Sequence, residues 1–282
     1  SPYSQEHHLP ELTARYAAAA FDEIPPYNSH PWVKNEDSPG ESPPVHPLRD
    51  RYIGYYAAVT ELDTNIGRIL DKLAEQGRLD NTLVIYTSDH GCALGHHGFW
   101  GKGNSTRPLN MYDTSLRVPL IWRGPGITGG QVVRRCVDHY ATFRTVLEMA
   151  GVTPDPERNH PGLSYGDLLR GESEVWNDNL YGEYGDLRML RTPDWKLVWR
   201  YPDGPHDLFD LLHDPEESVN LALDAKHQPL LADLKTRLDL FYAIHANPDK
   251  MGLAVKSLPR HNRTAEAWRD GRREARGLQI YS

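Results

Sequence analysis

Two residues that can hold a metal ion stand side by side in the first half of this 282-residue chain. Asp89 and His90 follow directly after residues 83–86, an apolar and β-branched run that is typical of a buried strand in a parallel sheet. Ligand sites in open α/β sheets form where strands end. Carboxylate oxygens suit calcium and a histidine nitrogen suits zinc, so the pair predicts a metal site and leaves the metal open.

Basic and polar side chains continue along the same loop. His96, His97 and Lys102 follow within a few residues, and Gly91 and Gly95 would let the backbone come close to a ligand. Such a composition is unusual for a purely structural loop. Two further residues lie where a substrate could be selected, Asn104 and Arg107.

The order and spacing of these residues resemble the sulfatase family of the alkaline phosphatase superfamily. The motifs that show this resemblance are Ser-Asp-His-Gly at 88–91, Leu-Gly-His-His-Gly-Phe-Trp-Gly-Lys at 94–102, Arg-Val-Pro-Leu-Ile at 117–121 and Gly-Pro-Gly at 124–126. Further matches precede them, at 62–67 and 80–82, and follow them, in Asp-Leu-Phe-Asp-Leu at 207–211 and at 214–221. The resemblance therefore covers about residues 3–221.

The resemblance implies a sulfuric ester hydrolase whose nucleophile is a calcium-bound formylglycine. Asp89 and His90 would complete the calcium shell, and Lys102 and His97 would stabilise charge on the sulfate or on the leaving group. Substrate contacts would come from His96, Asn104 and Arg107. The implied substrate is a sulfate ester of a carbohydrate or an aryl alcohol, and a periplasmic or secreted location is favoured.

The family's nucleophile motif is absent from this sequence. Cys92 and Cys136 lack the proline and arginine of the C-x-P-S-R pattern, and the strand with paired aspartates is also missing. Ser1-Pro2-Tyr3 resembles the residues that follow the family's A-P-H histidine. We therefore expect that these residues are the C-terminal portion of a longer sulfatase. By themselves they should neither hydrolyse sulfate esters nor bind calcium tightly.

Two other functions remain open. The first is a phosphoesterase or phosphonate hydrolase of the same superfamily, which a preference for phosphate over sulfate esters would reveal. The second is a non-catalytic remnant that keeps the fold without chemistry. Against a remnant stands the presence of Asp89, His90, His97 and Lys102 in one loop.

Composition restricts the partners. The formal net charge is −8 and the isoelectric point is near 5.9, which disfavours nucleic acid and anionic membranes because both require a basic surface. No apolar run approaches the ~20 residues of a membrane-spanning helix.

The elements that must position the loop suggest an α/β fold. The family resemblance implies an alkaline-phosphatase-like sandwich with a mostly parallel sheet, of which the catalytic part would occupy residues 1–152. Helices are predicted at 9–21, 56–75 and 138–150, and the apolar stripe of the second should cover one face of the sheet. Residues 83–86 and 118–122 should be adjacent core strands.

A smaller α+β subdomain should follow after a connecting loop region at 153–180. Residues 187–190, 195–201 and 207–211 are predicted to be antiparallel strands, and residues 227–245 a helix that covers them. This subdomain would occupy residues 181–282.

Overall fold

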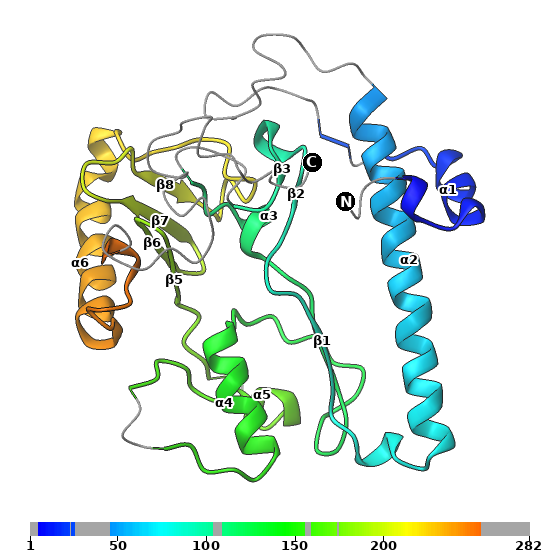
Figure 1. The fold of residues 1–282 in the computed structure, drawn as a ribbon. Coiled ribbons are helices and arrows are strands. Elements are labelled where there is room, and N and C mark those ends of the chain that lie inside the picture. The colour runs from blue at the N-terminus through cyan, green and yellow to red at the C-terminus, as the bar shows by residue number, and fades with distance from the viewer. Residues whose placement is uncertain are drawn as a thin grey trace. The chain divides into compact units, whose positions relative to one another are not determined.

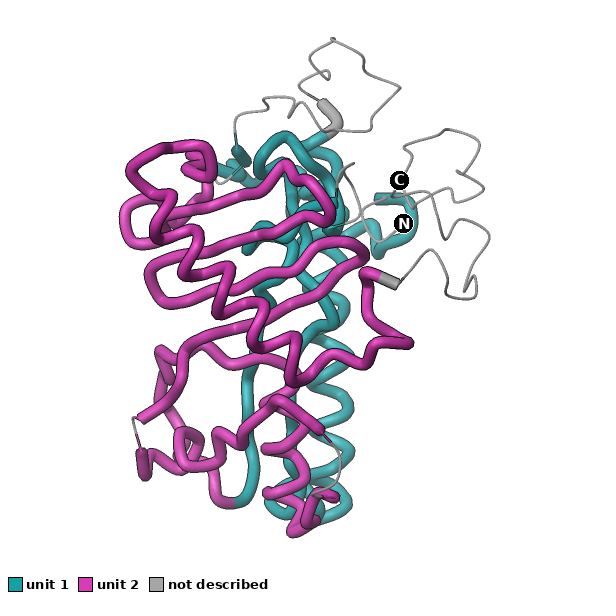
Figure 2. Tube along the Cα trace, turned by 90° about the vertical axis from the view of Figure 1, so that its left-hand side faces the viewer, with its two compact units in different colours: residues 1–125, 260–282 teal, residues 126–259 magenta. Residues whose placement is uncertain are grey.

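The computed structural model describes residues 5–22, 24–25, 46–103, 109–155, 159–173 and 175–254. The described residues up to Pro125 form one compact unit, and those from Gly126 onward form a second (Figures 1 and 2). Helices and strands occur in both, so the fold is of the mixed α/β type. No helix in these ranges combines the length and apolar composition of a membrane span.

One long helix dominates the first unit. α2 runs from His46 to Glu75, and its 30 residues correspond to a length of about 45 Å (Figure 1). It begins ten residues before the predicted start, because a proline in the first turn of a helix removes no helical hydrogen bond. The helix ends as predicted at Gly77, whose φ is 65°. Arg78 N donates to Leu73 O at 2.9 Å and closes the last turn.

The two ends of α2 differ in burial. Tyr52 and Ile53, near its start, are buried together with Phe21, beside α1 (Pro10–Ala17). Farther along, Val59, Leu62 and Ile69 are 43%, 47% and 61% exposed. The predicted burial of this apolar stripe against a sheet is therefore wrong for the described residues. The buried contacts come instead from the aromatic side chains of the first turns, where α1 packs.

A two-stranded sheet carries the loop that holds the candidate site. β1 (Val84–Thr87) and β4 (Leu120–Arg123) are adjacent, as predicted, but they pair antiparallel from Val84↔Arg123 to Thr87↔Leu120. No relative direction was predicted for these two strands, and the mostly parallel sheet of the expected sandwich stays a prediction. Residues 88–119 leave the end of β1 and return to that same end, whereas parallel strands need a crossover to the opposite end. The loop therefore starts and finishes at one edge.

Two helices open the second unit, α4 (His139–Met149) and α5 (Gly166–Arg170). The predicted bounds of α4 are confirmed by its caps. Asp138 Oδ1 accepts a hydrogen bond from Ala141 N at 2.8 Å, and Gly151 follows the helix with a φ of 68°.

A four-stranded antiparallel sheet follows, in the order β5 (Leu180–Tyr184), β6 (Leu187–Arg191), β7 (Trp195–Arg200) and β8 (Asp207–Asp210). The last three strands were predicted, and β5 was not. α6 (Gln228–His245) lies against this sheet (Figure 1). The core between them contains Leu190, Leu197, Leu208, Leu231, Leu234, Leu238 and Tyr242.

Charged side chains of β7 are buried in ion pairs. Lys196 Nζ lies 2.6 Å from Glu217 Oε1, and the two side chains are 0% and 2% exposed. Arg200 Nη2 lies 2.7 Å from Asp207 Oδ2. Burial raises the pKa of Asp207, although the Arg200 charge opposes this shift. Because side chains alternate along a strand, Leu197 can face the apolar core while Lys196 and Arg200 share the opposite face.

The remaining short elements complete the chain. They are η1 (Gln5–His7), η2 (Leu79–Asn81), β2 (Ala93–Leu94), η3 (His96–Gly98), β3 (Trp100–Gly101), α3 (Asp113–Leu116), η4 (Ala225–His227) and η5 (Gly252–Ala254).

Candidate active site

The turn after β1 brings the two predicted metal-binding residues together. His90 Nε2 lies 3.6 Å from Asp89 Oδ2, and the side chains are 40% and 85% exposed. His90 Nδ1 lies 2.8 Å from Gly91 O. Since a carbonyl oxygen only accepts hydrogen bonds, Nδ1 carries the hydrogen of this contact, and Nε2 lies beside the carboxylate. Ser88 Oγ donates to His90 O at 3.0 Å and fixes the turn.

Local interactions keep Asp89 ionised. Slight desolvation raises its pKa, but the neighbouring His90 charge and hydrogen bonds from the turn outweigh this and lower the pKa overall. The turn therefore offers a carboxylate oxygen next to an imidazole nitrogen. Calcium takes about six to eight oxygen ligands. No group of three His, Cys, Asp or Glu residues within the described ranges could hold a metal ion, so the roles of Asp89 and His90 as metal ligands stay a prediction.

Gly91 allows the turn to press against α3. Its N–H donates to Ser115 O at 3.0 Å. A Cβ atom at this position would lie 2.5 Å from Thr114 O and 2.9 Å from Arg117 O, which is closer than carbon and oxygen can approach. A glycine is therefore required for the turn and α3 to touch as they do.

A short hairpin carries the basic residues of the loop. β2 and β3 pair Ala93 with Gly101 and Leu94 with Trp100. Lys102 directly follows Gly101, so the hairpin returns it to the point where the chain leaves the Asp89–His90 turn. η3, which contains His96 and His97, forms the opposite end, about 7 Å away at a strand rise of ~3.4 Å per residue.

Packing fixes the two histidines in η3. His97 has a φ of 56°, and its ring stacks on that of Tyr112 with centroids 3.9 Å apart. Left-handed backbone at a non-glycine residue costs about 1–3 kcal/mol, so the surrounding contacts must hold it there. His96 Nδ1 is buried and has no hydrogen-bond partner among the described residues. Most buried polar atoms in proteins have a hydrogen-bond partner, so this nitrogen is an exception to the usual pattern.

Sequence reasoning missed Asn110, which is 0% exposed. Its Nδ2 donates to Gly103 O at 3.3 Å, and its Oδ1 accepts from Ser115 Oγ at 3.0 Å. The side chain therefore links the residue after Lys102 to α3, the helix on which Gly91 packs. The one signal in the sequence was a polar residue between two apolar ones, Leu109 and Met111, which are 2% and 3% exposed.

The structure thus distributes the predicted residues along one loop. Asp89 and His90 are in contact, Lys102 lies at the open end of the hairpin, and His96 and His97 lie at its turn. Asn104 and Arg107 fall outside the described residues, so their substrate contacts stay a prediction.

Two family models match the sequence. The model described as Sulfatase matches residues 2–152, which include the whole loop. The model described as N-sulphoglucosamine sulphohydrolase, C-terminal, matches residues 95–243.

Individual relatives agree with these matches. Arylsulfatase K from Canis lupus familiaris is 35% identical over 208 residues, covering 67% of this chain and 36% of the dog protein. The solved structure of BT4656 in complex with its substrate D-Glucosamine-2-N, 6-O-disulfate is 30% identical, with a TM-score of 0.62 over 71% of this chain and 42% of that chain. Phosphonate monoester hydrolase from Silicibacter pomeroyi is 27% identical, with a TM-score of 0.65 over 75% of this chain and 44% of that chain. This chain spans about a third to half of the length of the curated relatives it matches.

Proposed function

Because this chain belongs to the sulfatase family, we propose that its protein hydrolyses sulfate esters through the loop that follows β1. The observation that carries the proposal is the Sulfatase match over residues 2–152, since that range contains both the Asp89–His90 pair and Lys102. Arylsulfatase K, the curated relative named above, is an enzyme, which speaks against a non-catalytic remnant.

Lys102 and His97 are proposed to act on the sulfate group. A lysine ammonium stabilises charge on the nonbridging oxygens and on the leaving oxygen in the transition state. Gly103 follows Lys102 directly and is fixed by Asn110, which restricts where the lysine side chain starts. His97 would donate a hydrogen bond to the sulfate or orient Lys102. His96, Asn104 and Arg107 are proposed to contact the rest of the substrate.

Asp89 and His90 are proposed as two ligands of a calcium ion. When bound, calcium would neutralise negative charge on the reacting sulfate group. Support comes from the exposed carboxylate of Asp89, whose pKa is lowered, and from His90 Nε2, which lies 3.6 Å from it. The other ligands and the formylglycine nucleophile are proposed to lie outside this chain.

The exposed stripe on α2 supports the same proposal. Val59, Leu62 and Ile69 place apolar surface in contact with water, which isolated proteins rarely do over a continuous patch. We propose that further layers of an alkaline-phosphatase-like sandwich cover it, with residues 1–152 as the C-terminal part of the catalytic domain. Residues 153–180 would connect this part to a C-terminal subdomain formed by residues 181–282.

The proposed substrates are aryl sulfates and sulfated carbohydrates. One relative is an arylsulfatase, and a solved relative holds a disulfated glucosamine. A phosphonate monoester is the second candidate, because a phosphonate monoester hydrolase has a TM-score of 0.65 to this chain.

Replacing Lys102 in the natural-length protein tests the proposed mechanism. Lys102→Ala should lower kcat/KM for p-nitrophenyl sulfate by about 10²–10³-fold, the usual effect of removing one group that stabilises transition-state charge. Lys72→Ala is the matched control, since Lys72 is a 65% exposed surface lysine, and it should leave the rate unchanged. Full activity of Lys102→Ala would remove Lys102 from the mechanism. The 282 residues alone should release no sulfate, and measurable release would refute the proposed external nucleophile.

A further inference from the structure

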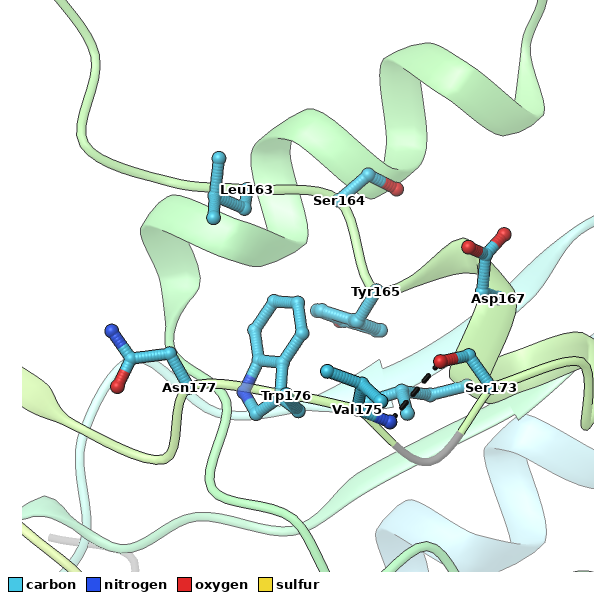
Figure 3. Close-up of a pocket in the computed structure, with 9 residues that line it drawn as sticks. Leu163, Ser164, Tyr165, Asp167, Ser173, Val175, Trp176 and Asn177 are labelled. Atoms are coloured by element: carbon cyan, nitrogen blue, oxygen red, sulfur yellow. Dashed lines mark hydrogen bonds between the residues drawn. The ribbon is translucent and has the colours of Figure 1, made fainter.

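A pocket of about 300 Å³ in the second unit lies outside the loop of the proposed active site. It is lined by residues 163–165, 167 and 168, at and before α5, and by residues 173 and 175–177, which precede β5. Figure 3 shows that Tyr165 comes from the first segment and Trp176 from the second, and that the two rings meet between them. Its volume falls at the lower end of the range for small-molecule sites, about 300–1,000 Å³.

The aromatic pair offers ring surface rather than hydrogen bonds. Trp176 Nε1 already donates to Cys136 O at 2.7 Å. The Tyr165 hydroxyl lies 2.9 Å from Thr142 Oγ1, whose own hydrogen is donated to Asp138 O. The rings are nearly perpendicular, at 88°, with centroids 6.1 Å apart. Tyr165 is buried and supports Trp176 from the side, so the half-buried indole is the platform that a ligand can reach.

Polar groups surround this platform. Ser173 Oγ accepts from Val175 N at 3.1 Å, which leaves its hydroxyl hydrogen available (Figure 3). Asn177 Oδ1 accepts both bonds from Asn179, which leaves the Nδ2 hydrogens of Asn177 as donors. Asp167 adds a carboxylate acceptor that is 64% exposed. A purely apolar ligand would desolvate these groups without replacing their hydrogen bonds.

The charge at the rim restricts the ligand further. Arg170 binds three carboxylates, those of Asp167 at 2.5 Å, Glu172 at 2.7 Å and Glu148 at 3.0 Å. One guanidinium facing three carboxylates leaves an excess of two negative charges beside the pocket. An anionic ligand would be repelled there.

We propose that this pocket binds an uncharged pyranose residue of a glycan. A pyranose combines an apolar C–H face, which can stack on the Trp176 indole, with a rim of hydroxyl groups that both donate and accept hydrogen bonds. Asp167 would accept from the sugar, and Ser173 and Asn177 would donate to it. The negative rim selects against sulfated residues, so this site differs in specificity from one that hydrolyses sulfate esters. It is independent of the proposed hydrolysis.

Saturation-transfer NMR with the natural-length protein tests the proposal, and binding at this pocket is measured as the part of the signal that Trp176→Ala removes. The probes are cellobiose and N,N′-diacetylchitobiose, both neutral, and glucosamine 6-sulfate. A pyranose of about twelve heavy atoms at a modest ligand efficiency gives a Kd of about 1 mM. We expect saturable binding of at least one neutral sugar, and binding of the sulfated sugar at least ~5-fold weaker.

Variants separate the stacking contribution from the charge contribution. Trp176→Ala should weaken neutral-sugar binding at least ~10-fold, as loss of an aromatic stacking platform does elsewhere. Trp176→Phe keeps a ring and should retain most of the affinity. Asp167→Asn should narrow the gap between neutral and sulfated sugars. Val132→Ala is the control, because Val132 is 78% exposed in the same unit and does not line the pocket.

Three results would overturn the proposal. They are absence of saturable binding of both neutral sugars, equal binding by Trp176→Ala when its circular dichroism matches the wild type, and equal or tighter binding of the sulfated sugar by the wild type.

Discussion

One substitution, glycine to alanine, should have opposite effects at two positions of the first unit. At Gly91 a new Cβ would lie 2.5 Å from Thr114 O, so the turn and α3 must separate by several tenths of an ångström. Their separation would also weaken the 3.0 Å bond from Gly91 N to Ser115 O. Overpacking costs about 1–3 kcal/mol and a hydrogen bond contributes about 1 kcal/mol, so Gly91→Ala should destabilise the protein by about 2–4 kcal/mol.

Gly67 is the matched control. It lies within α2, and a Cβ there would meet nothing within 4 Å. Alanine is favoured over glycine in a helix by about 0.5–1 kcal/mol, so Gly67→Ala should stabilise the protein by that amount.

Urea-induced unfolding followed by far-ultraviolet circular dichroism measures both effects. The midpoint should fall for Gly91→Ala and rise for Gly67→Ala, with similar slopes for the two variants and the wild type. An unchanged or raised midpoint for Gly91→Ala would show that the turn after β1 does not press against α3. The geometry assigned to the Asp89–His90 pair would then lose its support.

Three further substitutions test other parts of the structure by the same unfolding assay. Lys196→Met should lower the free energy of unfolding by about 3–5 kcal/mol because it leaves Glu217 buried without its cation. The double variant Lys196→Met with Glu217→Leu should recover most of this loss. Equal losses for the single and the double variant would contradict the buried pair. Asn110→Ala should cost about 1–2 kcal/mol because the Ser115 hydroxyl loses a buried acceptor, whereas the Gly103 carbonyl keeps its bond from the backbone N–H of residue 110; a loss below ~0.5 kcal/mol would count against this link. Burial raises the pKa of Asp138, although the hydrogen bond from Ala141 N opposes this shift. The stability that this group contributes is therefore fully present below the ordinary pKa of 3.8 and is lost as the pH rises through the raised pKa. Asp138→Asn keeps a helix cap and should be more stable than the wild type at pH 7, with the difference disappearing near pH 3.5; a difference independent of pH would contradict the shift.

Local sequence signals predicted the elements that have strong periodicity and clear ends. α4 was predicted because its apolar residues recur at helical spacing and Gly151 follows its end. α6 was predicted because its apolar residues recur at helical spacing, and most of them contact one core. These signals act within a few residues of the chain, so no knowledge of the rest of the fold was needed.

Pairing across the chain was harder to predict. The antiparallel direction of β1 and β4 depends on where residues 88–119 return, which no local pattern encodes. β5 was missed because Gly182 and Glu183 interrupt its apolar residues, and its pairing with β6 stabilises it instead. The burial of Lys196 was hidden because its partner, Glu217, lies in a separate segment.

The candidate site shows the same division. The residue types of Asp89, His90 and Lys102 were evident from the sequence, and so was their place in one loop. The contact between Gly91 and α3, and the bonds from Asn110 to Gly103 and Ser115, appear only once the loop has folded back on itself.

The most direct test of the proposed function compares two substrates with the same leaving group. The natural-length protein should be assayed with p-nitrophenyl sulfate and with a p-nitrophenyl phosphonate monoester, and the two kcat/KM values compared. We predict a higher value for the sulfate, reduced on both substrates by Lys102→Ala and on neither by Lys72→Ala. A higher value for the phosphonate would contradict the sulfatase proposal and would support the phosphonate hydrolase alternative.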